Sequence, residues 1–259
     1  MRGNSPLWLR KREEIGTFTK ILHYNTMKKF LALFAVVLFM LPAATLNGQE
    51  KYKLSDDKSD FVRVTDVVPD VILEIRYFST YNFVGTRVDG YEAPTAWLTR
   101  EAADSLKAIS DDVKAMGYRL KIYDAYRPQC AVDHFVRWAA DFADTTMKSY
   151  FYPRLTKDVL FPQGYIAEHS GHTRGSTVDL NLFDMNTEKE VDMGGTFDFF
   201  GIESHPSYVD GLTARQYLNR MLLRDVMQRH GFSAIEEEWW HFRLSKEPYP
   251  DTYFTFPVQ

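Results

Sequence analysis

The chain has 259 residues, of which 45% are hydrophobic and 15% aromatic, a composition typical of globular proteins rather than disordered or fibrous ones. Residues 1–49 hold seven basic and two acidic side chains, which leaves 24 of the 31 basic and 33 of the 35 acidic side chains, a net charge of −9, for residues 50–259. This acidic balance makes nucleic acid an unfavourable partner. The single cysteine, Cys130, excludes an internal disulfide and a thiolate zinc cluster, so any metal must be held by His, Asp or Glu.

The first part of the chain has the pattern of a targeting segment. Met27-Lys28-Lys29 precedes twelve apolar residues, 30–41, and Pro42-Ala43-Ala44 follows them, as in the charged, apolar and small-residue regions of a secretory signal peptide. A membrane-spanning helix needs about 20 apolar residues, so an anchor is the weaker alternative. We predict a signal peptide over residues 27–49, an upstream extension or misassigned start over residues 1–26, and an exported product, periplasmic or extracellular.

Residues 50–259 contain no internal repeat and no flexible linker, so they are predicted to form one domain. The hydrophobic periodicity and the turn residues predict, in chain order, a strand at 70–78, a helix at 99–116 with Thr99 as its cap and Gly117 as its stop, a strand at 118–123, a helix at 131–142, a strand at 178–182, a helix at 213–230 that ends at Gly231, and a strand around 239–244.

These elements mix without a regular βαβ rhythm, which predicts an α+β fold with a mainly antiparallel sheet and flanking helices. The helix at 213–230 is expected to bury four apolar residues, Leu218, Met221, Leu222 and Val226. Residues 144–165 are the least regular stretch and are interpreted as a rim or lid loop.

Two histidine-containing segments carry the candidate chemistry, and the first is a turn that leads into a strand. Residues 170–176 hold two glycines, and residues 177–182 alternate between polar and apolar side chains, which places Asp179 on the polar face. A turn that folds back over this face would bring His172 beside Asp179, and an imidazole nitrogen and a carboxylate oxygen are ligands that zinc accepts. A capping aspartate and a surface histidine are the alternative.

The second segment is Glu236-Glu237-Glu238-Trp239-Trp240-His241-Phe242. The aromatic residues favour a strand, and three adjacent glutamates repel one another, so at least one is expected to point into a site that needs charge. On a regular strand Glu238 and His241 would face opposite sides, so a bend or bulge is required if both serve one centre. The alternative is a solvated acidic edge beside an aromatic core with a hydrogen-bonded histidine.

Together, His172, Asp179 and His241 offer three protein ligands and leave the fourth tetrahedral position open, the arrangement of catalytic rather than structural zinc. Zinc lowers the pKa of bound water to about 7, and a nearby carboxylate such as Glu238 can take the proton as general base. These residue types therefore predict metal-dependent hydrolysis.

Arg127 lies at the end of the strand predicted at 118–123. A fixed guanidinium there could stabilise the oxyanion that forms when water attacks a carbonyl group. A structural ion pair with Asp124 is the alternative.

The motif Ser-x-His-x-x-Gly-x-x-x-Asp at 170–179, followed by Glu-x-x-His at 238–241, resembles the zinc D,D-peptidases that act on peptidoglycan, peptidase family M15. The finer resemblance is to the D-alanyl-D-alanine dipeptidases, including those of vancomycin resistance. Collinear support extends from about residue 66 to residue 259, at residues 76–85, 89–91, 124–128, 193–199, 238–241 and 247–254. The resemblance implies a hedgehog/D,D-peptidase-like zinc peptidase fold with one zinc ion per chain.

The resemblance also implies roles for eight residues: zinc ligands His172, Asp179 and His241, catalytic base Glu238, transition-state stabilisation by Arg127, binding of the substrate's ammonium group by Asp198, and a dipeptide pocket lined by Ser170 and Tyr77. From spacing alone, Asp198 would be a buried loop aspartate bonded to the main chain. Thr177 and Gly171 depart from the residues common in the family, Ala and Ser, which affects the expected packing of the pocket rather than the ligand set.

The implied activity is zinc-dependent hydrolysis of the small dipeptide D-alanyl-D-alanine to free D-alanine. The alternatives are a D,D- or L,D-carboxypeptidase that trims peptidoglycan stem peptides, and a non-catalytic zinc-containing module that binds wall fragments. No stable membrane span is expected once the signal peptide is cleaved. Because an exported enzyme cannot reach the cytosolic dipeptide pool, salvage or remodelling of cell-wall dipeptide is expected rather than resistance.

Overall fold

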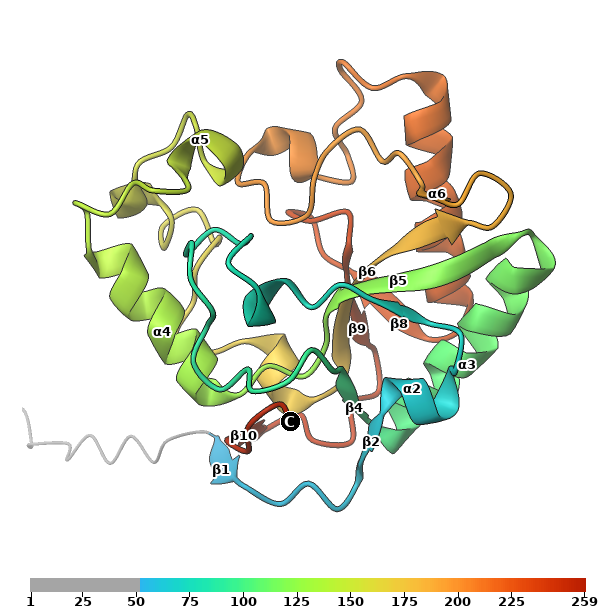
Figure 1. The fold of residues 1–259 in the computed structure, drawn as a ribbon, viewed down its shortest axis with the longest axis horizontal. Helices are drawn as coiled ribbons and strands as arrows, with labels where there is room; N and C mark the ends of the chain where they lie inside the picture. Colours follow the sequence, from blue (N-terminus) through green and yellow to red (C-terminus); the bar gives the residue numbers. More distant parts are fainter. Residues whose placement is uncertain (1–51) are drawn as a thin grey trace, which may run out of the picture. The chain divides into compact units, whose positions relative to one another are not determined.

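The structure, a computed structural model, describes residues 52–259, which form one mixed α+β unit (Figure 1). Its main sheet has the strand order β3-β5-β6-β9-β8, and β7 pairs with β6. The strands are β3 (Ile72–Leu73), β5 (Tyr118–Asp124), β6 (Thr177–Asp184), β7 (Lys189–Glu190), β8 (Phe232–Ala234) and β9 (His241–Leu244). Within this main sheet only the β3–β5 pair is parallel, so the predicted α+β class with a mainly antiparallel sheet is confirmed.

Two small sheets join segments that are distant in the sequence. Strand β1 (Lys53–Ser55) runs parallel to β10 (Thr252–Phe254), and β2 (Phe61–Arg63) runs antiparallel to β4 (Trp97–Thr99). In Figure 1 the C-terminus lies beside β10. The last residues of the chain therefore form part of the domain, beside its first described strand.

Helices flank the main sheet. The α-helices are α2 (Val64–Val67), α3 (Arg100–Ala115), α4 (Gln129–Ala140), α5 (Lys148–Phe151) and α6 (Ala214–Arg229), and the 3₁₀ turns are η1 (Arg76–Phe78), η2 (Lys157–Val159), η3 (Gly171–Arg174) and η4 (Ile202–Ser204). Figure 1 shows α3 and α6 together at one end of the sheet and α4 at the other. Within residues 52–259, no helix combines the length and the apolar character needed to cross a membrane.

The helix predicted at 99–116 is α3; helical spacing places Ala102, Leu106, Ile109, Val113 and Met116 on one face, and the first four are buried, whereas Met116 is exposed. Thr99 occupies the N-cap position, but its hydroxyl does not cap the helix: Oγ1 lies 2.8 Å from Ser176 Oγ. The helix ends at Gly117 as predicted, with a φ of 90°. Thr99 thus ties α3 to the start of β6 instead of stabilising the helix alone.

The strand predicted at 70–78 is mostly wrong. Only Ile72 and Leu73 pair with β5, and the chain then turns into η1. The alternation of apolar residues correctly predicted that Ile75 and Tyr77 are buried. It did not predict their secondary structure, because a buried 3₁₀ turn can bury the same side chains as a strand. The turn directs Tyr77 toward Asp198, to which its hydroxyl donates a hydrogen bond.

The inward face predicted for the helix at 213–230 is only partly right, since Val226 is buried as expected. The helix exists as α6, with a capping box between Thr213 and Gln216, but Leu218 is 58% exposed. Its buried residues are Asn219, Arg220, Leu223, Val226 and Met227. Polar side chains replace the expected leucine because carbonyl groups of a neighbouring loop, described below, are their partners.

The remaining predictions vary in outcome. The helix predicted at 131–142 is α4, and the strand predicted at 178–182 lies within β6. Residues 144–165 contain only the short α5 and η2, as expected of an irregular rim, and their movement as a lid stays a prediction. The signal peptide at 27–49 and the extension at 1–26 lie outside the described residues.

Gly175 generates a testable prediction about the turn that presents His172. Its φ is 78°, and a Cβ there would overlap the Phe61 ring. Gly175→Ala is expected to lose about 1–2 kcal/mol from the left-handed backbone and a further ~1–3 kcal/mol from overpacking. Gly164→Ala is the matched control, because its φ is 80° but nothing lies within 4 Å. Urea midpoints that fall equally in both variants would contradict the packing part of this expectation.

Candidate active site

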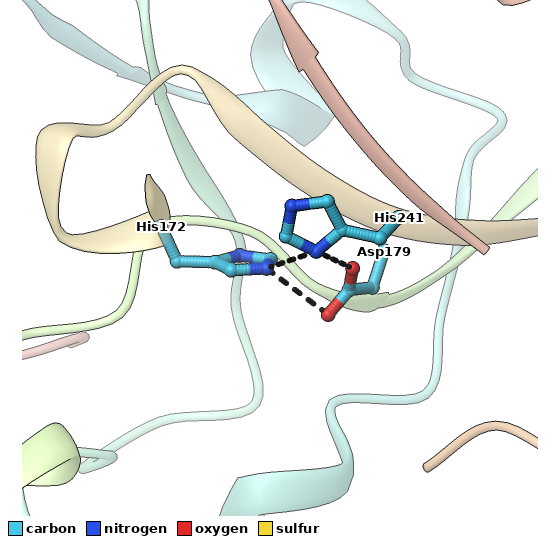
Figure 2. Close-up of side chains that lie close together, drawn as sticks. All are labelled: His172, Asp179 and His241. Carbon is cyan, nitrogen blue, oxygen red and sulfur yellow. Dashed lines mark hydrogen bonds and ion pairs between the residues drawn. The ribbon is translucent and has the colours of Figure 1, made fainter. Parts of the chain in front are cut away.

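Three side chains predicted as metal ligands meet at one point. His172 Nε2 lies 3.2 Å from Asp179 Oδ2 and 3.2 Å from His241 Nδ1, and His241 Nδ1 lies 3.1 Å from Asp179 Oδ1. Figure 2 shows the two imidazole rings and the carboxylate pointing toward one another. His172 and Asp179 are buried, and His241 is partly exposed. The predicted meeting of these three residues is therefore confirmed geometrically.

Strand register brings two of the three together. Asp179 on β6 lies directly opposite His241, the first residue of β9. His172 comes from η3, which immediately precedes β6 and is capped by Ser170, whose Oγ accepts a hydrogen bond from the His172 amide at 3.2 Å. His172 Nδ1 lies 2.7 Å from the Ala125 carbonyl oxygen. Since a carbonyl can only accept, Nδ1 donates, and Nε2 keeps its lone pair for the centre.

The donor set fits zinc. A tetrahedral ion with bonds of about 2.0–2.1 Å separates its ligand atoms by roughly 3.3–3.4 Å, close to the spacing of these nitrogen and oxygen atoms. Asp179 Oδ1 is buried and faces His241 Nδ1, 3.1 Å away. Two imidazole nitrogens and one carboxylate, with one tetrahedral position left, form the ligand set of a catalytic zinc site.

Glu238 reaches the same centre. Its Oε2 lies 3.3 Å from His241 Nδ1. The strand expected around Trp239 begins only at His241, and Trp239 and Trp240 form a turn instead. This turn supplies the bend that the spacing of Glu238 and His241 required. Both tryptophans are buried, so the turn is fixed in place by packing.

Arg127 forms the ion pair with Asp124 that was the alternative prediction, and it also lies beside the ligand Asp179. Nε donates to Asp124 Oδ2 at 2.9 Å, which is the structural ion pair, and Nη2 lies 3.7 Å from Asp179 Oδ2. The guanidinium also stacks on Tyr77, 5.0 Å from its ring centre. Burial would lower the pKa of Arg127, but the nearby acidic groups, Tyr77 and Asp124 first, outweigh burial and raise it above its usual value, so it stays a cation.

Asp198 is the most unusual carboxyl group of the site. It is buried and has a φ of 61°, uncommon for a residue with a side chain. Its Oδ1 accepts a hydrogen bond from the Tyr77 hydroxyl at 3.2 Å rather than from the main chain, and Oδ2 has no partner among the described residues. Burial, followed by repulsion from Asp179 and Glu238, raises the pKa of Asp198 well above its usual range.

All eight predicted site residues line one cavity of about 170 Å³, which also includes residues 164–167 at its rim and the rings of Phe83, Phe135 and Phe200. Such a volume is small beside the ~300–1,000 Å³ of pockets for drug-sized ligands. Asp124 and Tyr91 were not predicted as site residues, yet the Tyr91 hydroxyl donates to Asp124 Oδ1 at 2.5 Å beneath Arg127. Both residues lie in the segments 89–91 and 124–128, which support the resemblance to the dipeptidases, and this resemblance was the sequence signal for them.

Comparisons with known proteins agree with this geometry. Residues 57–259 match the family model Peptidase_M15, described as D-ala-D-ala dipeptidase. The chain belongs to this family. The curated D-alanyl-D-alanine dipeptidase of Enterococcus faecalis is 39% identical over 201 residues, covering 78% of this chain and 99% of that protein. The corresponding dipeptidase of Streptomyces coelicolor is 38% identical over 199 residues, covering 77% and 98%.

The likeness to solved structures is more distant. VanYB in complex with D-Alanine-D-Alanine has 15% sequence identity and a TM-score of 0.36, with coverage of 60% of this chain and 76% of that chain. The sequence relatives and the family model, which cover most of residues 57–259, are the findings that establish M15 membership. The prediction of an M15 metallopeptidase is confirmed.

Charge in this M15 site favours a cation at the ligand cluster. Burial would raise the pKa of Asp179, but attraction to and hydrogen bonds with His172 and His241 hold it well below its usual range. Burial would lower the pKa of His241, but hydrogen bonds to Asp179 and Glu238 outweigh burial and raise it from 6.5 to about 9. In the metal-free protein a proton on His241 thus meets part of the demand for positive charge.

The raised pKa predicts a pH-dependent stability of the metal-free protein. His241 contributes fully to the free energy of unfolding below about pH 6.5, the pKa of histidine in the unfolded chain. This contribution is lost as the pH rises through about 9, its pKa in the folded protein. With chelator present, urea midpoints should therefore fall between pH 6.5 and 9 more steeply in the wild type than in His241→Gln. His134→Gln is the control and should keep the wild-type slope. Equal slopes in all three proteins would remove His241 as the cause.

Proposed function

We propose that the chain is a zinc-dependent dipeptidase that hydrolyses D-alanyl-D-alanine to two molecules of D-alanine. One observation carries the proposal: a single small cavity holds a cluster suited to a cation and, separately, Asp198, a buried carboxyl group with one oxygen that has no partner among residues 52–259. A free dipeptide offers a peptide carbonyl for the first and an ammonium group for the second. The D-alanyl-D-alanine dipeptidases related to this chain support the choice of substrate.

His172, Asp179 and His241 would hold the zinc ion, which when bound supplies a Lewis acid that polarises the peptide carbonyl and acidifies water. Glu238, 3.3 Å from His241, is the carboxylate placed to take a proton from the attacking water. It then delivers this proton to the nitrogen of the leaving D-alanine, so that the C–N bond breaks and a neutral amine departs. Glu238 therefore returns the same proton that it accepted and ends the reaction as a carboxylate.

Arg127 is placed to stabilise the negative charge that develops on the carbonyl oxygen. Its contacts with Asp124 and the Tyr77 ring fix the guanidinium before the reaction. A cation held in this way requires little reorganisation when charge appears, and such preorganisation is a main source of catalysis.

Asp198 is proposed to bind the free ammonium group of the dipeptide, with Tyr77 holding the carboxylate through Oδ1. The unpartnered Oδ2 then receives a charged donor, which removes the cost of leaving it unsatisfied. Ser170 lines the cavity next to His172 and is assigned to the remaining part of the dipeptide pocket.

Glu238→Ala tests the catalytic base. The turnover number kcat for D-alanyl-D-alanine is expected to fall by about 10²–10⁴-fold, the usual worth of general acid–base catalysis. Zinc content should stay near that of the wild type, because Glu238 is not one of the three proposed ligands. Glu236→Ala is the matched control, since Glu236 is exposed in the same acidic run. Wild-type turnover in Glu238→Ala, or loss of its zinc, would contradict the assignment.

Asp198→Asn tests recognition of the amino terminus. It keeps the shape of the side chain but removes the charge, so kcat/KM for free D-alanyl-D-alanine should fall by roughly 10-fold or more. Cleavage of N-acetyl-D-alanyl-D-alanine, which has no ammonium group, should change much less. Asp210→Asn, at an exposed position, controls for the substitution itself. An unchanged ratio between the two substrates would remove Asp198 from recognition.

A D,D- or L,D-carboxypeptidase would use the same residues at the scissile bond but needs space for a longer peptide. The cavity of about 170 Å³, with the Asp198 carboxyl group buried in its wall, favours the dipeptide. Parallel assays with D-alanyl-D-alanine and a stem pentapeptide, each with and without chelator, separate these activities. No cleavage of either peptide by the zinc-loaded protein would instead indicate a binding module.

The proposed setting is outside the cytoplasm, where the enzyme would salvage or remodel dipeptide released from the cell wall. This part rests on the signal-peptide pattern of residues 27–49. N-terminal sequencing of the exported protein should show a mature chain that begins near residue 45 or residue 50. A mature chain that retains residues 1–40 would exclude the proposal.

A further inference from the structure

Arg220 is a buried cation that the proposed mechanism does not use. It lies on α6, is 2% exposed, and donates three hydrogen bonds to main-chain carbonyls. Nε reaches Met193 at 2.6 Å, Nη2 reaches Glu203 at 2.9 Å, and Nη1 reaches His205 at 3.2 Å. Burying a guanidinium is costly unless its donors are satisfied, so this position has a specific requirement for arginine.

The three carbonyls lie at the two ends of one loop, residues 193–205, which we term the Asp198 loop. Met193 is at its start, Glu203 and His205 are at its end, and Asp198 lies near the middle. One guanidinium therefore holds together the two ends of the segment that carries the proposed ammonium-binding carboxyl group. The adjacent Asn219 adds a hydrogen bond from Nδ2 to the Asp192 carbonyl at 2.8 Å.

The Asp198 loop has little secondary structure with which to satisfy its backbone. It contains only the short η4, and Asp198 has a left-handed backbone with a φ of 61°. A residue in this conformation persists only when its surroundings enforce it. Within the loop, Ser204 Oγ donates to the Phe199 carbonyl at 2.5 Å. The Phe200 amide connects the loop to α5 by donating to the Phe151 carbonyl at 2.7 Å. Arg220 supplies the contacts that close the loop.

Arg220 is also connected to the turn that follows the proposed base. Its guanidinium carbon lies 5.8 Å from the centre of the Trp239 ring, and the Trp239 amide donates to the Ser204 carbonyl at 2.9 Å. The end of the Asp198 loop and the residue after Glu238 are therefore joined beside Arg220. Loss of the guanidinium should disturb the loop more than the turn, because all three of its hydrogen bonds go to the loop.

We propose that Arg220 is a positioning residue that holds Asp198 in place and so sets the preference for a free amino terminus. The inference rests on the proposed dipeptidase function. It acts through the loop backbone, since Arg220 does not line the active-site cavity. Lysine has a single nitrogen and cannot reach carbonyls at both ends of the loop as the planar guanidinium does.

The test compares Arg220→Lys and Arg220→Met with Arg215→Met, whose arginine is exposed on the first turn of the same helix. In Arg220→Met, kcat/KM for D-alanyl-D-alanine should fall by roughly 10- to 100-fold, mainly through KM, the size expected for a misplaced binding group. Cleavage of N-acetyl-D-alanyl-D-alanine should fall much less. Arg220→Lys should be intermediate, and Arg215→Met should match the wild type.

A double-mutant cycle separates positioning from a general loss of structure. In the Asp198→Asn background, Arg220→Met should no longer change the ratio between the two substrates, because the group that it positions is already neutral. A parallel fall for both substrates, or an equal change of the ratio in both backgrounds, would overturn the proposal.

Hydrogen exchange gives a readout that does not depend on turnover. Arg220→Met should speed amide exchange in residues 193–205 and leave β6 protected, whereas unchanged exchange in the loop would also overturn the proposal. The proposed function fails separately, if the zinc-loaded wild type does not cleave D-alanyl-D-alanine. In that case the exchange measurement still decides whether Arg220 holds the loop.

Discussion

The antiparallel register of β6 between β5 and β9 is the constraint on which the site depends. It sets Asp179 opposite Asp124 on one side and opposite His241 on the other, so three polar residues from distant segments form one row across the sheet. Side chains on a strand alternate between faces, and a slip of one residue would turn Asp179 away from the row. His172 and Arg127 join the row through short segments attached to these same strands, and their positions follow from the same register.

The row concentrates charge where water is scarce, and the fold balances it locally. Arg127 neutralises Asp124, while the Asp179 carboxylate faces two imidazole rings that can carry either a proton or a metal ion. Binding of metal and stability of the domain are consequently linked, because an empty cluster leaves this carboxylate dependent on a protonated His241. A metal ion bound here would therefore compensate the charge of Asp179 as well as supply a Lewis acid for the reaction.

Much of this arrangement is readable from the sequence where local chemistry decides the structure. The glycine-containing turn before an alternating strand correctly predicted His172 above Asp179, and helical spacing predicted α3. Prediction failed where distant partners decide. A buried 3₁₀ turn at Arg76–Phe78 has the same apolar pattern as a strand. The sequence showed that a bend between Glu238 and His241 was needed for both to reach one centre, but it did not show that Trp239 and Trp240 form it. The assignment of residues 27–49 as a signal peptide, and with it the export of the protein, stays a prediction.

The failure on α6 is the most instructive, because it concerns the side chains that support the site. Hydrophobic patterning placed Leu218 inward, whereas the helix buries Asn219 and Arg220 against the Asp198 loop. A loop without regular pairing leaves carbonyl groups that need donors, and polar residues on a neighbouring helix can supply them. The sheet thus orders the groups proposed for chemistry, and α6 orders the loop proposed for recognition. Because the sheet and α6 support these two groups separately, a change in α6 can alter the selectivity for a free amino terminus while the row of Asp124, Asp179 and His241 is preserved.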